Sequence, residues 1–181
     1  PTSKPPVTVV ILVLLQFVLF AIFAFGVNSS KGSYWINLYA SLCLVPAHVH
    51  WYSPLTYSFL HERVFHLSAN MLFLWVFGSS LEDALKWKKF LSIYLGSAIL
   101  TGLLQVAITR ITHGSDGLIP IVGASGAISS LIGMFAVRFY RSKISIIGLP
   151  AKVPAITLLV LTVCIEMGMT IWSIVQKMQG N

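Results

Sequence analysis

The sequence predicts an all-α membrane protein, a polytopic helical bundle, and two observations carry this prediction. Hydrophobic residues make up 56% of the 181 residues, whereas charged residues make up only 9%. Soluble domains usually carry about a quarter charged residues, so this chain has too few charges to solvate a globular surface. Long uncharged apolar runs are the second observation. Together they disfavour a water-soluble enzyme, a disordered chain and a nucleic-acid-binding protein.

Five apolar runs are long enough to cross the hydrocarbon core of a bilayer as helices. Nothing in them alternates with a period of two, so helices are favoured over a β-barrel. The first run is longer than the apolar part of a signal peptide, and we interpret it as a span. All five are expected to form one transmembrane domain over residues 1–181. The predicted spans are Val7–Val27, Val64–Leu81, Phe90–Ile108, Ile119–Val137 and Val153–Val175, the last of which contains Glu166.

The net charge of +7 is interpreted as a signal of membrane topology, not of nucleic-acid binding. If the N-terminus lies inside, most Lys and Arg residues fall in inner loops, as the positive-inside rule requires. The sequence therefore predicts an inner N-terminus. The short core without long tails favours the bacterial plasma membrane as its location. The inner basic residues are Lys4, Lys86, Lys88, Lys89, Arg138, Arg141, Lys143 and Lys152.

The first outer segment, Asn28–Pro54, is rich in tyrosine and tryptophan. Such amphipathic rings favour the level of the lipid headgroups, so we expect this segment to lie on or partly in the outer leaflet. It is either an ordinary interfacial loop or a rim around a site that opens to this side.

Two polar residues in the second span are candidates for function. His66 and Asn70 are four residues apart, which places them on one helix face, one turn apart. An imidazole N–H and a carboxamide NH₂ are both donors, and together they can stabilise negative charge that develops on an oxygen. The alternative is a hydrogen-bonding pair that only holds helices together.

The fourth span contains a serine between small residues, in the segment Gly123-Ala124-Ser125-Gly126. A serine near a helix N-terminus lies among unpaired N–H groups, which are suitable donors to an oxyanion. Small residues also let helices pack closely, and Gly126 with Ser130 and Ser129 with Gly133 fit that simpler interpretation. The serine motif alone therefore does not decide between packing and catalysis.

The motifs taken together resemble those of the rhomboid intramembrane serine proteases. The resemblance lies in their order and spacing and extends from about the first span to the end of the chain. It rests on Thr56-Tyr57-Ser58-Phe59-Leu60-His61, His66-x-x-x-Asn70, Phe77-Gly78 through Leu81-Glu82-Asp83, and Gly123-Ala124-Ser125-Gly126 with Gly133.

The resemblance implies a six-helix core that cleaves single-pass transmembrane proteins near the outer leaflet. It implies that Ser125 is the nucleophile and that His66 and Asn70 stabilise the oxyanion together with the Ser125 N–H. No metal and no cofactor are expected, and no nucleic acid is expected as a partner.

The resemblance also assigns supporting roles. His61 matches an outer histidine with a structural or supporting role, and Glu82 matches an acidic residue expected to hold the loop that follows the second span. Gly123 belongs to the serine motif. Gly126 and Gly133 match positions where the fourth helix packs tightly on its neighbour.

The general base of the family is a histidine on a sixth helix, and the sequence as given reaches only five spans. We therefore expect the chain to be incomplete at its C-terminus, with the dyad histidine absent from residues 1–181. His113 precedes the fourth span and is a weak candidate to approach Ser125. The histidines present are His48, His50, His61, His66 and His113.

Two other functions stay open at this point. An inactive rhomboid-like protein would bind transmembrane helices without cleaving them, and it would not need the missing base. A channel or transporter with His66 and Asn70 lining a polar path is disfavoured, because no inverted repeat is evident.

Overall fold

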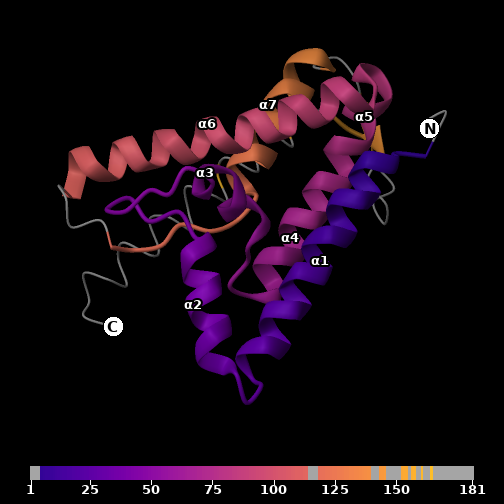
Figure 1. The fold of residues 1–181 in the computed structure, drawn as a ribbon. Coiled ribbons are helices and arrows are strands. Elements are labelled where there is room, and N and C mark those ends of the chain that lie inside the picture. Colours follow the sequence, from indigo (N-terminus) through magenta and orange to yellow (C-terminus); the bar gives the residue numbers. More distant parts are fainter. Residues whose placement is uncertain are drawn as a thin grey trace. The chain divides into compact units, whose positions relative to one another are not determined.

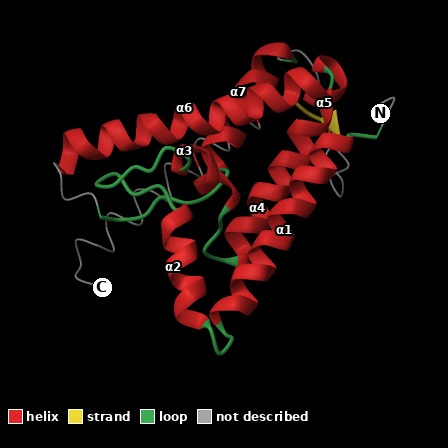
Figure 2. Ribbon diagram, viewed as in Figure 1, coloured by secondary structure: helices red, strands yellow, loops and turns green. Residues whose placement is uncertain are grey.

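The computed structural model describes residues 5–113, 118–139, 143–145, 152–154, 156–157, 160 and 164. The chain divides into two compact units, Pro1–Leu131 and Ile132–Asn181, and each is described by itself. Helices dominate the described residues, as Figure 2 shows, so the predicted all-α class is confirmed.

The first unit is built on two long apolar segments that run side by side in opposite directions (Figure 1). The first is α1, Val7–Val27. The second passes without a break through α4 (Val64–Phe73), the π-helical turn η2 (Leu74–Gly78) and α5 (Ser79–Leu85). The π-helical turn lies in the middle of this segment, where each backbone hydrogen bond spans one more residue than in an α-helix.

A sharp turn at Lys86 separates α5 from the longest helix, α6 (Trp87–His113). Lys86 adopts a φ of 68°, a left-handed conformation that ends one helix and redirects the chain into the next. Tyr94 of α6 is fully buried and accepts a hydrogen bond from the amide of Gln16 in α1, at 3.2 Å. This bond gives the Gln16 amide N–H a partner inside an otherwise apolar contact, whereas Gln16 Oε1 is buried without one among the described residues.

The predicted outer segment contains a helix, α2 (Gly32–Leu42), which packs on the C-terminal end of α1. Phe23 of α1 meets the rings of Trp35 and Tyr39 edge-on, with centroids 6.0 and 5.3 Å apart. Two short helical turns follow, α3 (Ser53–Thr56) and η1 (Tyr57–Phe59). Trp51 is 92% exposed, as expected for an aromatic residue at a membrane interface.

The fourth predicted span is wrong at its N-terminal end. We expected a helix from Ile119, but α7 covers Ser125–Arg138 and begins six residues later. Ile121 instead forms a two-way backbone pairing with Leu44, with N–O distances of 2.8 and 3.1 Å. Gly123 then takes a φ of 115°, which no helix contains. The segment before Ser125 is therefore a shaped loop.

The second unit begins inside α7 and includes a short antiparallel pair, β1 (Lys143–Ser145) and β2 (Lys152–Pro154). Lys143 pairs with Pro154 and Ser145 with Lys152. This pair lies between the fourth and fifth predicted spans. The fifth span and Glu166 fall largely outside the described residues.

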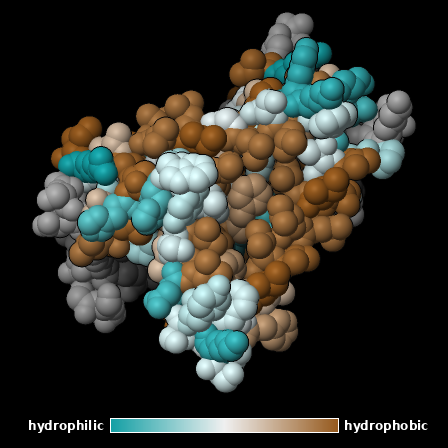
Figure 3. Space-filling model, in the orientation of Figure 1, coloured by the Kyte–Doolittle hydropathy of each residue, from teal (hydrophilic) through white to brown (hydrophobic). Residues whose placement is uncertain are grey.

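Three helical segments are long and apolar enough to cross a membrane: Val7–Val27, Val64–Leu85 and Trp87–Thr112. They match the first three predicted spans, whereas α7 is a shorter apolar helix. In Figure 3, hydrophobic residues cover the visible side of α1 and hydrophilic residues gather near its two ends. The protein is a multi-pass membrane protein.

Candidate active site

The structure brings the serine motif against the polar pair of the second span. His66 and Asn70 both lie in α4, one turn apart as predicted. A Cβ added to Gly123 would lie 2.8 Å from Cε1 and 3.1 Å from Nε2 of His66, and 3.9 Å from Nδ2 of Asn70. The loop that leads into Ser125 therefore lies directly on the two side chains predicted to donate hydrogen bonds.

Tyr57 holds this loop in place through its main chain. The N–H of Gly123 donates to the carbonyl oxygen of Tyr57 at 3.0 Å, next to the Leu44–Ile121 pairing. The Tyr57 side chain is buried, and its hydroxyl bonds to the carbonyl oxygen of Ala98 at 2.8 Å and to the Thr101 hydroxyl at 3.3 Å. Burial raises the pKa of the Tyr57 phenol above its usual 10.0. One residue thus joins α6 to the serine loop.

Ser125 is the first residue of α7 and is half-buried. The first hydrogen bond of the α7 ladder runs from the N–H of Ile128 to the carbonyl oxygen of Ala124, at 3.0 Å. The three N–H groups before Ile128 therefore have no partner within the helix. The expectation that the serine lies at a helix N-terminus, among such donors, is confirmed.

Gly126 allows α7 to approach α6 closely. A Cβ at Gly126 would lie 2.8 Å from the Cβ of Thr101, a separation that real side chains do not tolerate. The Ser130 hydroxyl donates to the carbonyl oxygen of Gly126 at 3.0 Å. The close packing expected at Gly126 is therefore present, with Thr101 as the neighbour.

His61 is the direct hydrogen-bond partner of Asn70, a relationship that the spacing of His66 and Asn70 did not reveal. Asn70 Nδ2 and His61 Nε2 are 2.9 Å apart, and both side chains are buried. The His66 ring meets the His61 ring edge-on, with centroids 5.2 Å apart. Burial, followed by the proximity of His66, lowers the pKa of His61 from 6.5 to about 4. His61 is therefore neutral at physiological pH.

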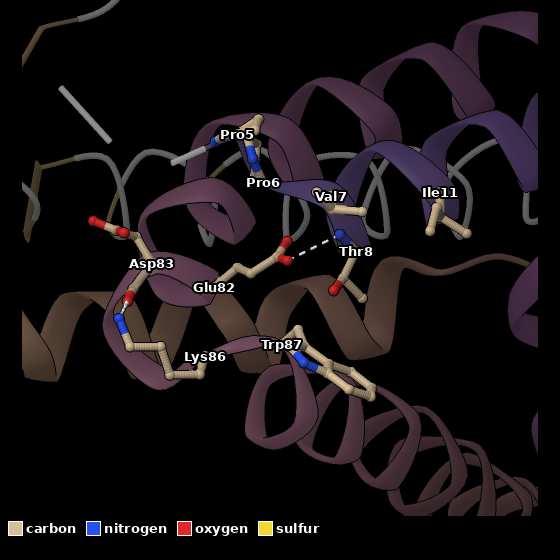
Figure 4. Close-up of a pocket in the computed structure, with 9 residues that line it drawn as sticks. All are labelled: Pro5, Pro6, Val7, Thr8, Ile11, Glu82, Asp83, Lys86 and Trp87. Atoms are coloured by element: carbon tan, nitrogen blue, oxygen red, sulfur yellow. Dashed lines mark hydrogen bonds between the residues drawn. The ribbon is translucent and has the colours of Figure 1, made fainter. Parts of the chain in front are cut away.

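Glu82 holds a different element from the one expected. We expected it to hold the loop that follows α5, but its two carboxylate oxygens accept from the N–H groups of Thr8 and Val9, both at 2.9 Å. Figure 4 shows the side chain pointing to the start of α1, in a cavity of about 480 Å³. Thr8 and Val9 lie in the first turn of α1, where N–H groups have no acceptor within the helix, so Glu82 satisfies donors that the helix itself cannot.

Two further residues singled out in the sequence are Gly133 and His113. Among the described residues of the second unit, a Cβ at Gly133 would meet nothing within 4 Å, so the tight packing expected there is not seen. The side chain of His113 falls outside the described part of the chain. Over the residues that are described, no group of three or more His, Cys, Asp or Glu side chains is placed to hold a metal ion.

The fold and this site define a class: a polytopic helical membrane protein in which the loop before a helix-initial serine lies against a histidine–asparagine pair on a neighbouring span. The family model of the Rhomboid domain matches residues 48–179. The chain therefore belongs to the rhomboid family.

Individual relatives agree with this membership. The chain is 32% identical over 99 residues to the mitochondrial presenilin-associated rhomboid-like protein of Mus musculus, covering 54% of this chain and 26% of the relative. It is 36% identical over 93 residues to the mitochondrial Rhomboid protein 1 of Saccharomyces cerevisiae, with 51% and 27% covered. It is 32% identical over 127 residues to the rhomboid relative YdcA of Bacillus subtilis, with 70% and 60% covered. The chain thus spans about a quarter of the length of the two mitochondrial relatives.

Proposed function

We propose that this chain forms most of the core of an intramembrane serine endopeptidase that cleaves transmembrane proteins. The observation that carries the proposal is the contact of Gly123 with His66 and Asn70. It joins a serine at a helix N-terminus to two side-chain donors, which are two of the parts that acyl transfer requires.

In the proposed reaction the Ser125 Oγ attacks the carbonyl carbon of the scissile peptide bond and loses its proton to a base. Negative charge moves to the carbonyl oxygen, where the Ser125 N–H, His66 and Asn70 donate hydrogen bonds. The intermediate collapses as the C–N bond breaks and the base returns the proton to the leaving amine. Water then attacks the acyl-enzyme and releases the second product.

The proposal also needs a general base, and neither histidine beside the serine loop is available for that role. His61 is already bonded to Asn70, and His66 is assigned to the oxyanion. The family resemblance supplies the base from a histidine on a further helix. A serine hydroxyl without such a base is a poor nucleophile, so the full-length chain is the material for every activity test.

We propose that the substrates are single-pass transmembrane segments that unwind near small or helix-breaking residues, because a helix shields its peptide carbonyls. Two of the relatives are named as mitochondrial and one comes from Bacillus subtilis. The relatives therefore do not support the expected location in the bacterial plasma membrane.

The test is labelling and cleavage by the full-length protein in lipid. A serine-reactive covalent inhibitor is expected to label Ser125, and Ser125→Ala is expected to abolish labelling and cleavage of a helix-breaking transmembrane substrate. His66→Ala and Asn70→Ala are each expected to lower turnover by about 10²–10³-fold, as for loss of one oxyanion donor.

Ser130→Ala is the matched control, because the Ser130 hydroxyl bonds only to the carbonyl oxygen of Gly126 in its own helix among the described residues. Its turnover should equal that of the unmodified protein. Undiminished cleavage by Ser125→Ala would contradict the catalytic assignment. Binding of the substrate helix without cleavage by the unmodified protein would favour an inactive, helix-binding relative.

A further inference from the structure

A cavity of about 350 Å³ is lined by His61 and lies between the C-terminal part of α1, the helix α2 and the residues before α4. Phe20, Phe23 and Val27 form part of its apolar wall. Its polar lining comes from Tyr39, His61, Glu62 and Asn28. A mixed lining of this kind, with room for solvent, is suited to ordered water.

The bond between Asn70 and His61 determines where the ring proton of His61 lies. A carboxamide NH₂ only donates, so His61 Nε2 accepts the 2.9 Å bond from Asn70 Nδ2. A neutral imidazole carries one proton, which must then be on Nδ1. His61 Nδ1 is thus a hydrogen-bond donor, and it is oriented away from Asn70.

That donor has no partner within the described part of the chain. His61 is only 4% exposed, and its Nδ1 is buried without a hydrogen bond. The hydroxyl oxygen of Tyr39 is likewise buried and unpaired among the described residues. Buried polar groups are normally satisfied by protein or by bound water, and leaving them unsatisfied costs free energy. Both residues line the same cavity, from different elements.

We propose that this cavity holds a bound water that accepts from His61 Nδ1–H and bonds to the Tyr39 hydroxyl, making His61 a positioning residue for Asn70. The role in turnover rests on the proposed function, whereas the water and the proton position do not. Glu62 lines the same cavity and offers a carboxylate as a further acceptor.

The consequence for the site lies in the second N–H of Asn70. One N–H is committed to His61, so the carboxamide plane is fixed and the other N–H is free to face the serine loop. Asn70 Nδ2 is already within 3.9 Å of the point where a Cβ of Gly123 would stand. A fixed donor stabilises a developing charge without reorganisation, which is how such donors increase turnover.

The first experiment reads the proton of His61 directly, in the full-length protein with ¹⁵N-labelled imidazole. At neutral pH we expect Nδ1 to carry the proton and Nε2 to be the acceptor. In Tyr39→Phe we expect the Nδ1 proton to exchange faster with solvent. A proton on Nε2 would overturn the proposal, whatever the enzyme activity.

The second experiment compares two tyrosines of the same helix. Tyr39→Phe should lower kcat about tenfold with KM changed less than about twofold, as expected when only positioning in the transition state is weakened. Tyr34→Phe is the matched control, because Tyr34 is 61% exposed and does not line the cavity. Equal turnover of the two variants would overturn the proposal. Cleavage by Ser125→Ala would instead contradict the proposed function and leave the proton position of His61 unaffected.

Discussion

The imidazole of His66 lies against Gly123 and occupies the space that a Cβ at position 123 would need. A Cβ on Gly123 would stand 2.8 Å from Cε1 of the imidazole, and the φ of 115° at this position is itself one that L-residues rarely adopt. Two independent constraints, the backbone conformation and the available space, therefore require glycine immediately before the Ala124-Ser125 step.

Gly123→Ala is expected to displace the serine loop from His66 and lower turnover of the full-length enzyme by about 10²-fold, because small misplacements at a reacting centre are costly. The measurement is cleavage of a transmembrane substrate at matched protein concentration. Gly96→Ala is the control: a Cβ there would meet nothing within 4 Å among the described residues, so activity should be unchanged. Equal activity of the two variants would contradict this reading of the contact.

Gly126→Ala is expected to lower thermal stability, because its new Cβ would press on the Cβ of Thr101, 2.8 Å away. Overpacking of this kind typically costs about 1–3 kcal/mol. Gly133→Ala lies in the same helix and meets nothing within 4 Å among the described residues, so it should be neutral or slightly stabilising. The measurement is the midpoint of thermal unfolding in detergent, which should fall in Gly126→Ala and not in Gly133→Ala. Comparable losses of stability in both would show that Gly133 is packed after all.

Glu82→Gln is expected to destabilise the protein by about 1–3 kcal/mol, since an amide presents one acceptor where the carboxylate now serves two N–H donors. The midpoint of thermal or denaturant unfolding measures this effect. Glu62→Gln removes a charge of the same kind from an exposed side chain but keeps an acceptor towards the cavity that Glu62 lines, so it should change the midpoint far less. If Glu82→Gln unfolds at the same midpoint as the unmodified protein, the two bonds contribute nothing net.

Tyr57→Phe removes the hydroxyl that bonds to Ala98 and Thr101 but keeps the carbonyl oxygen that holds Gly123. We expect a loss of about 1 kcal/mol in unfolding free energy, with turnover per folded molecule preserved at low temperature. The test is to measure the unfolding midpoint and kcat of Tyr57→Phe and of the unmodified protein. A large fall in kcat without a stability change would place the hydroxyl itself in the chemistry.

His61 predicts how stability depends on pH. Its pKa is about 4 in the folded protein against 6.5 unfolded, so the unfolded chain binds a proton between these values and the folded one does not. The free energy of unfolding should therefore fall as the pH is lowered from about 6.5 towards 4. Unfolding measured across this window in the unmodified protein and in His61→Gln is the test. An equally steep slope in the variant would assign the effect to other groups.

The fold class was predictable because membrane spans depend on composition and length alone. Three segments have the required length and hydropathy, and the Val64 boundary was correct to the residue. Ile119–Gly123 misled the prediction, since an apolar run does not distinguish a helix from a loop. Its pairing with Leu44 joins residues more than seventy positions apart, and no local pattern encodes it.

The candidate site was predictable as a set of residues but not as a set of partners. The four-residue spacing placed His66 and Asn70 on one face, and the glycines marked the serine. The bonds of Asn70 to His61 and of Gly123 to Tyr57 depend on how separate elements fold against one another. Tyr57 belongs to the motif that carried the resemblance, which was the available signal, but residue identity alone does not say that its carbonyl is the functional atom.

The Glu82 bonds also constrain the order in which the protein can be made. α1 is synthesised before α5. The Glu82 carboxylate, which accepts from the first turn of α1, lies 74 residues after Thr8 in the sequence. Until α4 and α5 have been inserted beside α1, the N–H groups of Thr8 and Val9 must therefore donate hydrogen bonds to water or to lipid headgroups. Because these bonds join the start of α1 to α5, we expect α1 and Val64–Leu85 to reach their final hydrogen bonding together during biogenesis.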